Sequence, residues 1–123
     1  VAIFFEARAE PTVGMEAVAN VIINRVEDSR YPDTVCDVVW QPSQFSFTHD
    51  GLTDDPEAHT GYQDTLAWVT SQMVAKEALQ GNLIGITSTH YHAEYVLPFW
   101  ADTYNKDGVV GTHVFYTNQT EYR

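Results

Sequence analysis

Two stretches of the sequence repeat apolar residues at intervals of three and four, which is the spacing of one face of an α-helix. The first covers 14–29, and its series is Met15, Val18, Ala19, Ile22, Ile23 and Val26. The second covers 62–80 and is followed by Gly81 and Asn82, residue types that commonly end helices. Because an apolar helix face has to pack against another element, we expect these two helices to form the core.

Shorter helical segments accompany the two long ones. A helix over 1–9 should end just before Pro11, because proline disfavours helical backbone in the residue before it. A helical turn should run from Asp33 or Thr34 to Val39, since either side chain can cap a helix by accepting a backbone hydrogen bond. The first half of the chain is therefore predicted to be helical.

The second half of the chain is predicted to hold the strands. The segments 85–96 and 108–118 are rich in Thr, Val, Ile, Tyr and Phe and are bounded by Gly and Pro, so each is expected to form a strand. Earlier in the chain, 41–47 has an extended pattern and 48–60 has the composition of a surface loop. Helices followed by a small antiparallel sheet indicate the α+β class.

Size and charge limit the possible organisation and partners. With 123 residues the chain is predicted to be a single domain over 1–123, and we expect a monomer. The 17 acidic and 6 basic residues give a net charge of -11, which argues against nucleic acid and anionic membranes as partners. The single Cys36 excludes an internal disulfide.

No run of 18 apolar residues is present, so we predict no membrane-spanning helix. The first residues also lack the basic region and cleavage site of a signal peptide. The chain nevertheless begins inside an expected helix, which leaves open a targeting segment or a further domain upstream. Localisation therefore has to be inferred from function.

The stretch FFEARAEP, residues 4–11, places Glu6 and Glu10 four residues apart on one helix face. Apolar residues surround Glu6, and apolar surroundings raise the pKa of a carboxyl group, which suits a general acid. Glu10 lies at the helix end, close to Arg8 in sequence, and is expected to be solvated or salt-bridged. The residues alone leave open whether Glu6 catalyses a reaction or is an ordinary, partly exposed carboxylate.

Histidines and aromatic residues supply further candidates. His90 and His92 are spaced to lie on one face of a strand, but the chain lacks close His pairs with zinc-site spacing, so we predict no metal and no cofactor. Amide and hydroxyl groups among planar rings suit a carbohydrate groove. The polar and aromatic residues concerned are Gln41, Gln44, Phe45, Ser46, Tyr91, Tyr95, Phe99, Trp100, Tyr104, Phe115 and Tyr116. Most of these rings are also suited to filling the core.

Five segments together resemble the SleB-like cell wall hydrolase family, which includes the spore-cortex-lytic enzymes. In order, they are EARAEP, AVANVIINRV, VVWQPSQFSF, THYHAEYVLPFWA and GTHVFY. The resemblance covers about Ile3 to Tyr116 and implies a small α+β domain like lysozyme and the lytic transglycosylases, acting on peptidoglycan. Two departures are Ala9, where the family usually has Gly, and the acidic loop from Asp50 to Glu57.

The resemblance also assigns roles to residues. It places the catalytic acid on Glu6 and the family's Gln-Pro-x-Gln-Phe-Ser element on Gln41 to Ser46. Its aromatic-His strand falls on Tyr91 and His92, and its closing Gly-x-His-x-Phe segment falls on Gly111, His113 and Phe115. We therefore expect Glu6 to be catalytic, and the expected substrate-binding residues are Gln44, Ser46, Tyr91, His92, His113 and Glu10.

The expected reaction is cleavage between N-acetylmuramic acid and N-acetylglucosamine, as a lytic transglycosylase that needs one catalytic glutamate, or else as a muramidase. Peptidoglycan is the expected partner, and the expected place of action is the cell wall, outside the cell or in the periplasm. Two other function classes stay open: a non-catalytic peptidoglycan-binding module, and a metal-dependent amidase or peptidase built on His90, His92 and His113.

Overall fold

The computed structural model describes residues 1–41, 45–48 and 50–118. Four α-helices and two short 3-10 helices (η1 and η2) come first in the described chain, and three strands follow. Their bounds are α1 Ala2–Ala7, α2 Thr12–Glu27, α3 Val35–Val39, η1 Ser46–Thr48, η2 Pro56–Ala58, α4 Tyr62–Leu79, β1 His90–Ala93, β2 Asn105–Val110 and β3 His113–Thr117. The predicted α+β class is confirmed, and the four α-helices fall where the sequence patterns indicated.

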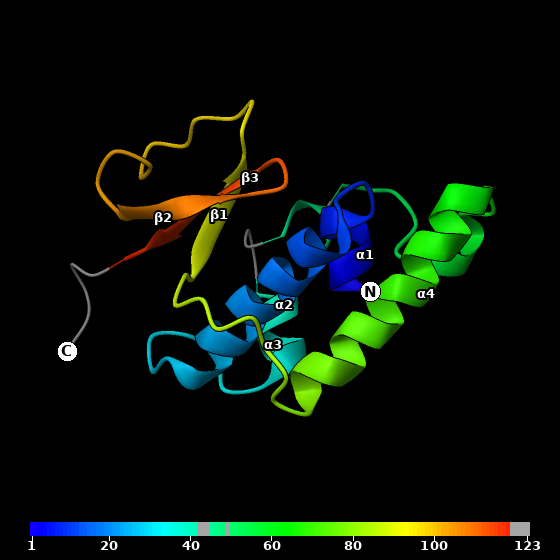
Figure 1. The fold of residues 1–123 in the computed structure, drawn as a ribbon, viewed down its shortest axis with the longest axis horizontal. Helices are drawn as coiled ribbons and strands as arrows, with labels where there is room; N and C mark the ends of the chain where they lie inside the picture. The colour runs from blue at the N-terminus through cyan, green and yellow to red at the C-terminus, as the bar shows by residue number, and fades with distance from the viewer. Residues whose placement is uncertain (42–44, 49, 119–123) are drawn as a thin grey trace.

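Helix α2 occupies the centre of the molecule, with the sheet on one side and α4 on the other (Figure 1). Its Val18 is fully buried in the main core with Phe4 of α1 and Val38 of α3. A second, smaller core joins Ala17 and Val21 of α2 to Phe115 of the sheet. Helix α2 therefore contributes buried apolar residues to both cores, and it fixes the position of the sheet relative to α1.

The sheet is antiparallel with the strand order β1-β3-β2. The segment 108–118, predicted as one strand, contains the end of β2, a turn and β3. Gly111 in this turn has a φ of 60°, a conformation that glycine adopts without steric cost. The prediction of one strand was wrong because two strands with similar composition flank a turn that is only two residues long.

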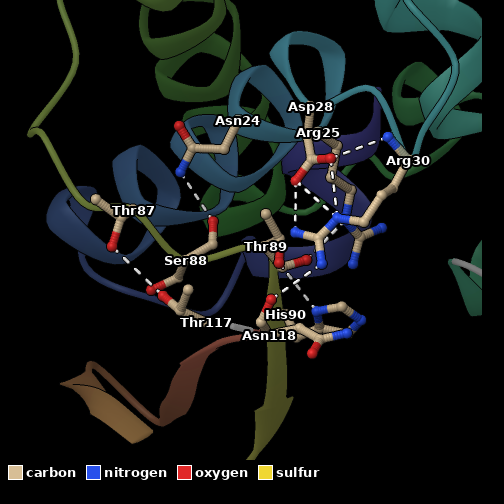
Figure 2. Close-up of polar contacts among 10 residues, drawn as sticks. All are labelled: Asn24, Arg25, Asp28, Arg30, Thr87, Ser88, Thr89, His90, Thr117 and Asn118. Atoms are coloured by element: carbon tan, nitrogen blue, oxygen red, sulfur yellow. Dashed lines mark hydrogen bonds and ion pairs between the residues drawn. The ribbon is translucent and has the colours of Figure 1, made fainter. Parts of the chain in front are cut away.

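The predicted strand over 85–96 is a strand only from His90 to Ala93. Side chains of α2 bond the preceding backbone instead of a neighbouring strand. Asn20 Oδ1 accepts hydrogen bonds from the N–H groups of Gly85 and Ile86, at 2.9 and 3.0 Å. Asn24 Nδ2 donates to the carbonyl oxygens of Ile86 and Ser88, at 2.9 and 2.8 Å, and Figure 2 shows the second of these contacts.

The end of α2 is tied to the sheet by charged residues (Figure 2). Arg25 Nε donates to the carbonyl oxygen of Thr89 at 2.7 Å. Arg30 pairs with Asp28 at 2.6 Å and donates to the carbonyl oxygen of Asn118, just after β3, at 2.9 Å. These contacts set where β1 begins and therefore which residues of β1 face α1.

Two loop predictions had mixed outcomes. The segment 41–47 was expected to be extended, but Ser46–Thr48 form the 3-10 helix η1, and 42–44 lie outside the described residues. The predicted loop over 48–60 is irregular where it is described, apart from η1 and η2. In the described part of the chain, no helix is long and apolar enough to cross a membrane.

Candidate active site

Glu6 lies on α1, whose other side chains are mostly buried, and it is itself partly buried. The hydroxyl group of Tyr91, on β1, donates a short hydrogen bond to Glu6 Oε1. The two residues are 85 positions apart in sequence, and the α2 contacts described above bring them together. The partnership between Glu6 and Tyr91 is the centre of the candidate site.

The surroundings of Glu6 act on its pKa in opposite directions. Burial raises it, while the hydrogen bond from Tyr91 and the charge of Arg25 lower it, and the net result is a raised pKa. Burial also raises the pKa of Tyr91 well above its usual value, and the nearby Glu6 raises it further, so the phenol keeps its proton. Glu6 is thus placed to hold a proton more firmly than an exposed glutamate does.

Arg25 is a functional candidate that the sequence patterns did not single out. Its side chain is only 4% exposed, and the guanidinium lies over the rings of Tyr31 and Phe45, at 5.3 and 5.4 Å. Burial lowers its pKa, but the usual pKa of a guanidinium is so high that the group stays charged. The sequence feature that could have indicated a buried Arg25 is its position directly before Val26, within the apolar series of the predicted helix 14–29.

Strand alternation places Tyr91 and His92 on opposite faces of the sheet. The ring of Tyr91 packs against His113 at 5.0 Å and against Phe115 at 5.4 Å, on the face that meets the helices. His92 Nε2 lies 2.9 Å from the Tyr116 hydroxyl on the other face. The structure therefore brings Tyr91 to Glu6 and does not bring His92 there.

The outer face of the sheet carries a cluster of rings. His90 and His92 both pack against Trp100, at 5.1 and 5.8 Å, as their spacing predicted. Tyr104 stacks on Trp100 at 5.3 Å. Within the described residues, no three His, Cys, Asp or Glu side chains gather closely enough to hold a metal ion. The amidase hypothesis, which needs such a group, gains no support from this arrangement.

Glu10 was expected to be solvated or salt-bridged, but in the structure its carboxylate bonds the neutral residue Thr112. The Glu10 side chain is 7% exposed. Thr112, in the β2–β3 turn, donates to both carboxylate oxygens, from its N–H at 2.7 Å and from Oγ1 at 2.6 Å. Arg8 instead lies 3.8 Å from Asp64 and contacts His59. The expectation failed because the partner of Glu10 is 102 residues away in sequence.

His113 connects the surroundings of the two glutamates. It is 8% exposed, and its Nδ1 lies 4.0 Å from Glu10 Oε1 while its ring packs on Tyr91. In the described part of the chain this Nδ1 is a buried atom with no hydrogen-bond partner. Burial lowers the pKa of His113 despite the opposing effect of Glu10, so the imidazole is neutral near neutral pH.

The predicted Gln44 lies outside the described residues, as does the side chain of Ser46. Two phenylalanines on either side of Ser46 in sequence are described. Phe47 stacks on Phe5 of α1 at 5.3 Å, and Phe45 is 2% exposed beneath the Arg25 guanidinium. The 3-10 helix η1 therefore lies beside α1, the helix that carries Glu6.

Comparisons with known proteins show the family to which this chain belongs. A family model described as "Cell Wall Hydrolase" matches residues 9–116. The chain is 41% identical over 68 residues to a spore cortex-lytic enzyme of Halalkalibacterium halodurans, and 28% identical over 119 residues to one of Bacillus cereus. These matches cover 53% and 93% of this chain, but only 21% and 40% of the two relatives, so the chain spans well under half of their length.

Two solved structures have the same fold. The catalytic domain of SleB from Bacillus anthracis, named a germination-specific lytic transglycosylase, superposes with a TM-score of 0.75 at 28% identity, over 94% of this chain and 88% of that one. The catalytic domain of the Bacillus cereus SleB protein gives 0.74 at 28% identity, over 94% and 84%. By its family match and its fold, the chain belongs to the cell wall hydrolase family.

Proposed function

We propose that this chain cleaves peptidoglycan glycan strands between N-acetylmuramic acid and N-acetylglucosamine, with Glu6 as the acid and base. The observation that carries the proposal is the partly buried Glu6 carboxyl, whose pKa is raised and whose Oε1 accepts a hydrogen bond from Tyr91. The family match begins at residue 9, after Glu6, so the role of Glu6 rests on this geometry and on the resemblance of its motif.

In the first step, neutral Glu6 donates its proton to the glycosidic oxygen as the bond from that oxygen to the muramic C1 breaks. Positive charge develops at C1, and Glu6 becomes a carboxylate. The hydrogen bond from Tyr91 and the charge of Arg25 both favour the carboxylate form. The raised pKa supplies the proton, and these two groups stabilise the product of its transfer.

In the second step, the Glu6 carboxylate takes the proton of the muramic 6-hydroxyl while that oxygen bonds to C1. The sugar closes to a 1,6-anhydro product, and Glu6 regains its proton. A hydrolase of the ordinary two-carboxylate type needs a second acid facing the same sugar. The neighbouring Glu10 has both carboxylate oxygens occupied by Thr112, which favours the transglycosylase.

Other residues are proposed to orient the glycan rather than to move protons. Gln44, Ser46 and His113 have amide, hydroxyl and imidazole groups suited to the acetamido and hydroxyl groups of the sugars. His92 remains a predicted glycan contact that would act from the outer face of the sheet. We also propose that the protein acts outside the cytoplasm, because peptidoglycan lies there.

The change Glu6→Gln tests the proposal, because the amide keeps the shape of the side chain but has no proton to transfer. We expect the fall in turbidity of a peptidoglycan suspension to slow by about 100- to 10,000-fold, with an unchanged fold in circular dichroism. The exposed Glu27→Gln is the matched control and should keep wild-type activity. A folded Glu6→Gln protein with normal activity would refute the assignment.

A further inference from the structure

The Glu10 side chain packs between helix α2 and the β2–β3 turn, which are distant in sequence. An added Cβ at Gly14, on α2, would lie 2.8 Å from the Glu10 Cβ, and one at Gly111, in the β2–β3 turn, would collide with Glu10 Oε1. The Glu10 side chain thus occupies the space that side chains at these two positions would need, with its Cβ next to Gly14 and its carboxylate next to Gly111. Glycine at 14 and 111 is explained by the presence of Glu10 between them.

The contact with Thr112 fixes the turn from two directions. Thr112 gives Glu10 one hydrogen bond from its backbone and one from its side chain. The carbonyl oxygen of Thr112 also accepts a hydrogen bond from the N–H of Glu94, just after β1, at 2.9 Å. The same residue therefore connects the segment between α1 and α2 to both β1 and β3.

A chain of contacts connects the β2–β3 turn to Glu6, the candidate acid. His113 follows Thr112 and packs its ring on Tyr91, and Tyr91 in turn donates to Glu6. We propose that Glu10 is a positioning residue, whose carboxylate anchors the β2–β3 turn so that His113 holds the Tyr91 hydroxyl against Glu6. The effect on catalysis rests on the proposed function, whereas the effect on the contact between Glu6 and Tyr91 does not.

Two changes break the anchor at its two ends. Glu10→Gln removes the charge, and Thr112→Val removes only the hydroxyl while keeping the shape. We expect each to lower kcat by about ten- to a hundredfold with KM changed less than about twofold, since orientation and not glycan contact is lost. Thr112→Ser, which keeps the hydroxyl, should restore kcat. Matched controls are Glu27→Gln and Thr103→Val, both at exposed positions.

The titration of Glu6 can be measured without any enzymatic assay, by recording the chemical shift of its carboxyl carbon by NMR as the pH is changed. The groups that act on this titration are Tyr91 from β1 and Arg25 from α2. If Glu10→Gln and Thr112→Val weaken the hydrogen bond from Tyr91, Glu6 should titrate at a higher pH in both proteins. In Thr112→Ser it should titrate at the same pH as in the wild type. Wild-type protein that releases no muropeptides would defeat the proposed function, and this titration would still decide the positioning role.

Two results would overturn the positioning role. One is a Glu6 titration that is unchanged in folded Glu10→Gln and Thr112→Val proteins. The other is a rise in KM in Glu10→Gln alone, with kcat and the pH profile unchanged, which would mean that Glu10 touches the glycan itself. Folding is checked by the melting temperature, and Thr112→Val keeps the test usable if Glu10→Gln does not fold.

Discussion

Glu6 and Glu10 are the same residue type four positions apart, yet their pKa values are shifted in opposite directions. Burial dominates at Glu6 and raises its pKa. At Glu10, burial acts in the same direction, but the two hydrogen bonds from Thr112 and the nearby His113 outweigh it, and the pKa is lowered. Glu6 lies on α1, whereas Glu10 lies just beyond its end, where Thr112 and His113 of the sheet reach it. The difference in pKa therefore comes from tertiary contacts.

The two shifts predict opposite effects on stability. The raised pKa of Glu6 means that its favourable contribution is present below about pH 4.5 and is lost as the pH rises through its folded pKa. The melting temperature of Glu6→Gln should therefore be close to that of the wild type in acid and higher than that of the wild type at neutral pH. Thermal melts of both proteins between pH 4 and 8 test this, and an equal difference at every pH would contradict it.

For Glu10 the sign is reversed. Its lowered pKa gives stability that is present above about pH 4.5 and is lost as the pH falls through the folded pKa. Glu10→Gln should lower the free energy of unfolding by about 1.5–3 kcal/mol at neutral pH, the usual value of hydrogen bonds to a charged group, and by less as the pH falls through the folded pKa of Glu10. Urea unfolding at pH 7 and pH 3.5 measures this, with Glu27→Gln expected to be neutral at both.

Tyr91→Phe isolates the hydrogen bond to Glu6 and keeps the ring packing. Removing this donor should raise the pKa of Glu6 and slow peptidoglycan cleavage by about tenfold, the factor expected for one hydrogen bond to a carboxylate. Because Glu6 has to be protonated at the start of the reaction, the pH at which activity falls on the alkaline side should move upward. A pH–rate profile identical to that of the wild type would show that Tyr91 has no part in catalysis.

At the scale of single residues, the apolar neighbours of Glu6 made it a candidate acid, and only the family resemblance assigned it a catalytic role and Tyr91 a substrate-binding role. It did not find Arg25, because a cation in a helical pattern is usually exposed. It also misjudged the environment of Glu10, whose partner Thr112 lies in a turn near the other end of the chain. Burial and long-range partners decide these cases, and neither can be read from local spacing.

At the scale of elements, the helices were predictable because their apolar periodicity reports directly on burial. The stretch 85–89 was not, since its composition is that of a strand but its backbone bonds to Asn20, Asn24 and Arg25 of α2. The sequence pattern of α2 contains these polar residues but does not say what they bond. Side chains of one helix thus take the place of a neighbouring strand.

The change Asn24→Leu tests this anchoring. It removes the donor to two backbone carbonyl oxygens in the stretch 85–89 and should lower the free energy of unfolding by about 2–4 kcal/mol. Urea denaturation gives the value, with the exposed Glu27→Leu on the same helix as the control. A loss no larger than that of the control would mean that α2 does not hold this segment.

The shifted pKa of His90, at the start of β1, leads us to expect a further effect of pH on stability. Burial, together with the charges of Arg25 and Arg30, lowers its pKa from 6.5 to about 4. Its contribution to stability is therefore present above pH 6.5 and is lost as the pH falls toward 4. His90→Phe, which keeps a ring against Trp100 and Tyr104, should melt with a weaker pH dependence in this window. An unchanged dependence would contradict the shift.

At the scale of the whole molecule, the net charge of -11 should affect binding to the proposed substrate, peptidoglycan. Peptidoglycan is itself anionic, so the two repel each other at low ionic strength. Screening by salt should improve binding as the salt concentration rises from very low values to about 0.15 M, where the screening length is about 8 Å. Sedimentation with insoluble peptidoglycan measures this, and binding that only weakens with added salt would contradict it.

The most direct test of the account is mass spectrometry of the muropeptides released from purified peptidoglycan. The account predicts 1,6-anhydro-muramic ends from the wild type and almost none from Glu6→Gln at equal protein concentration. Reducing muramic ends would mean that Glu6 still acts as the acid but that water, instead of the muramic 6-hydroxyl, attacks C1. Anhydro ends produced equally by a folded Glu6→Gln protein would contradict the central claim that Glu6 transfers the proton.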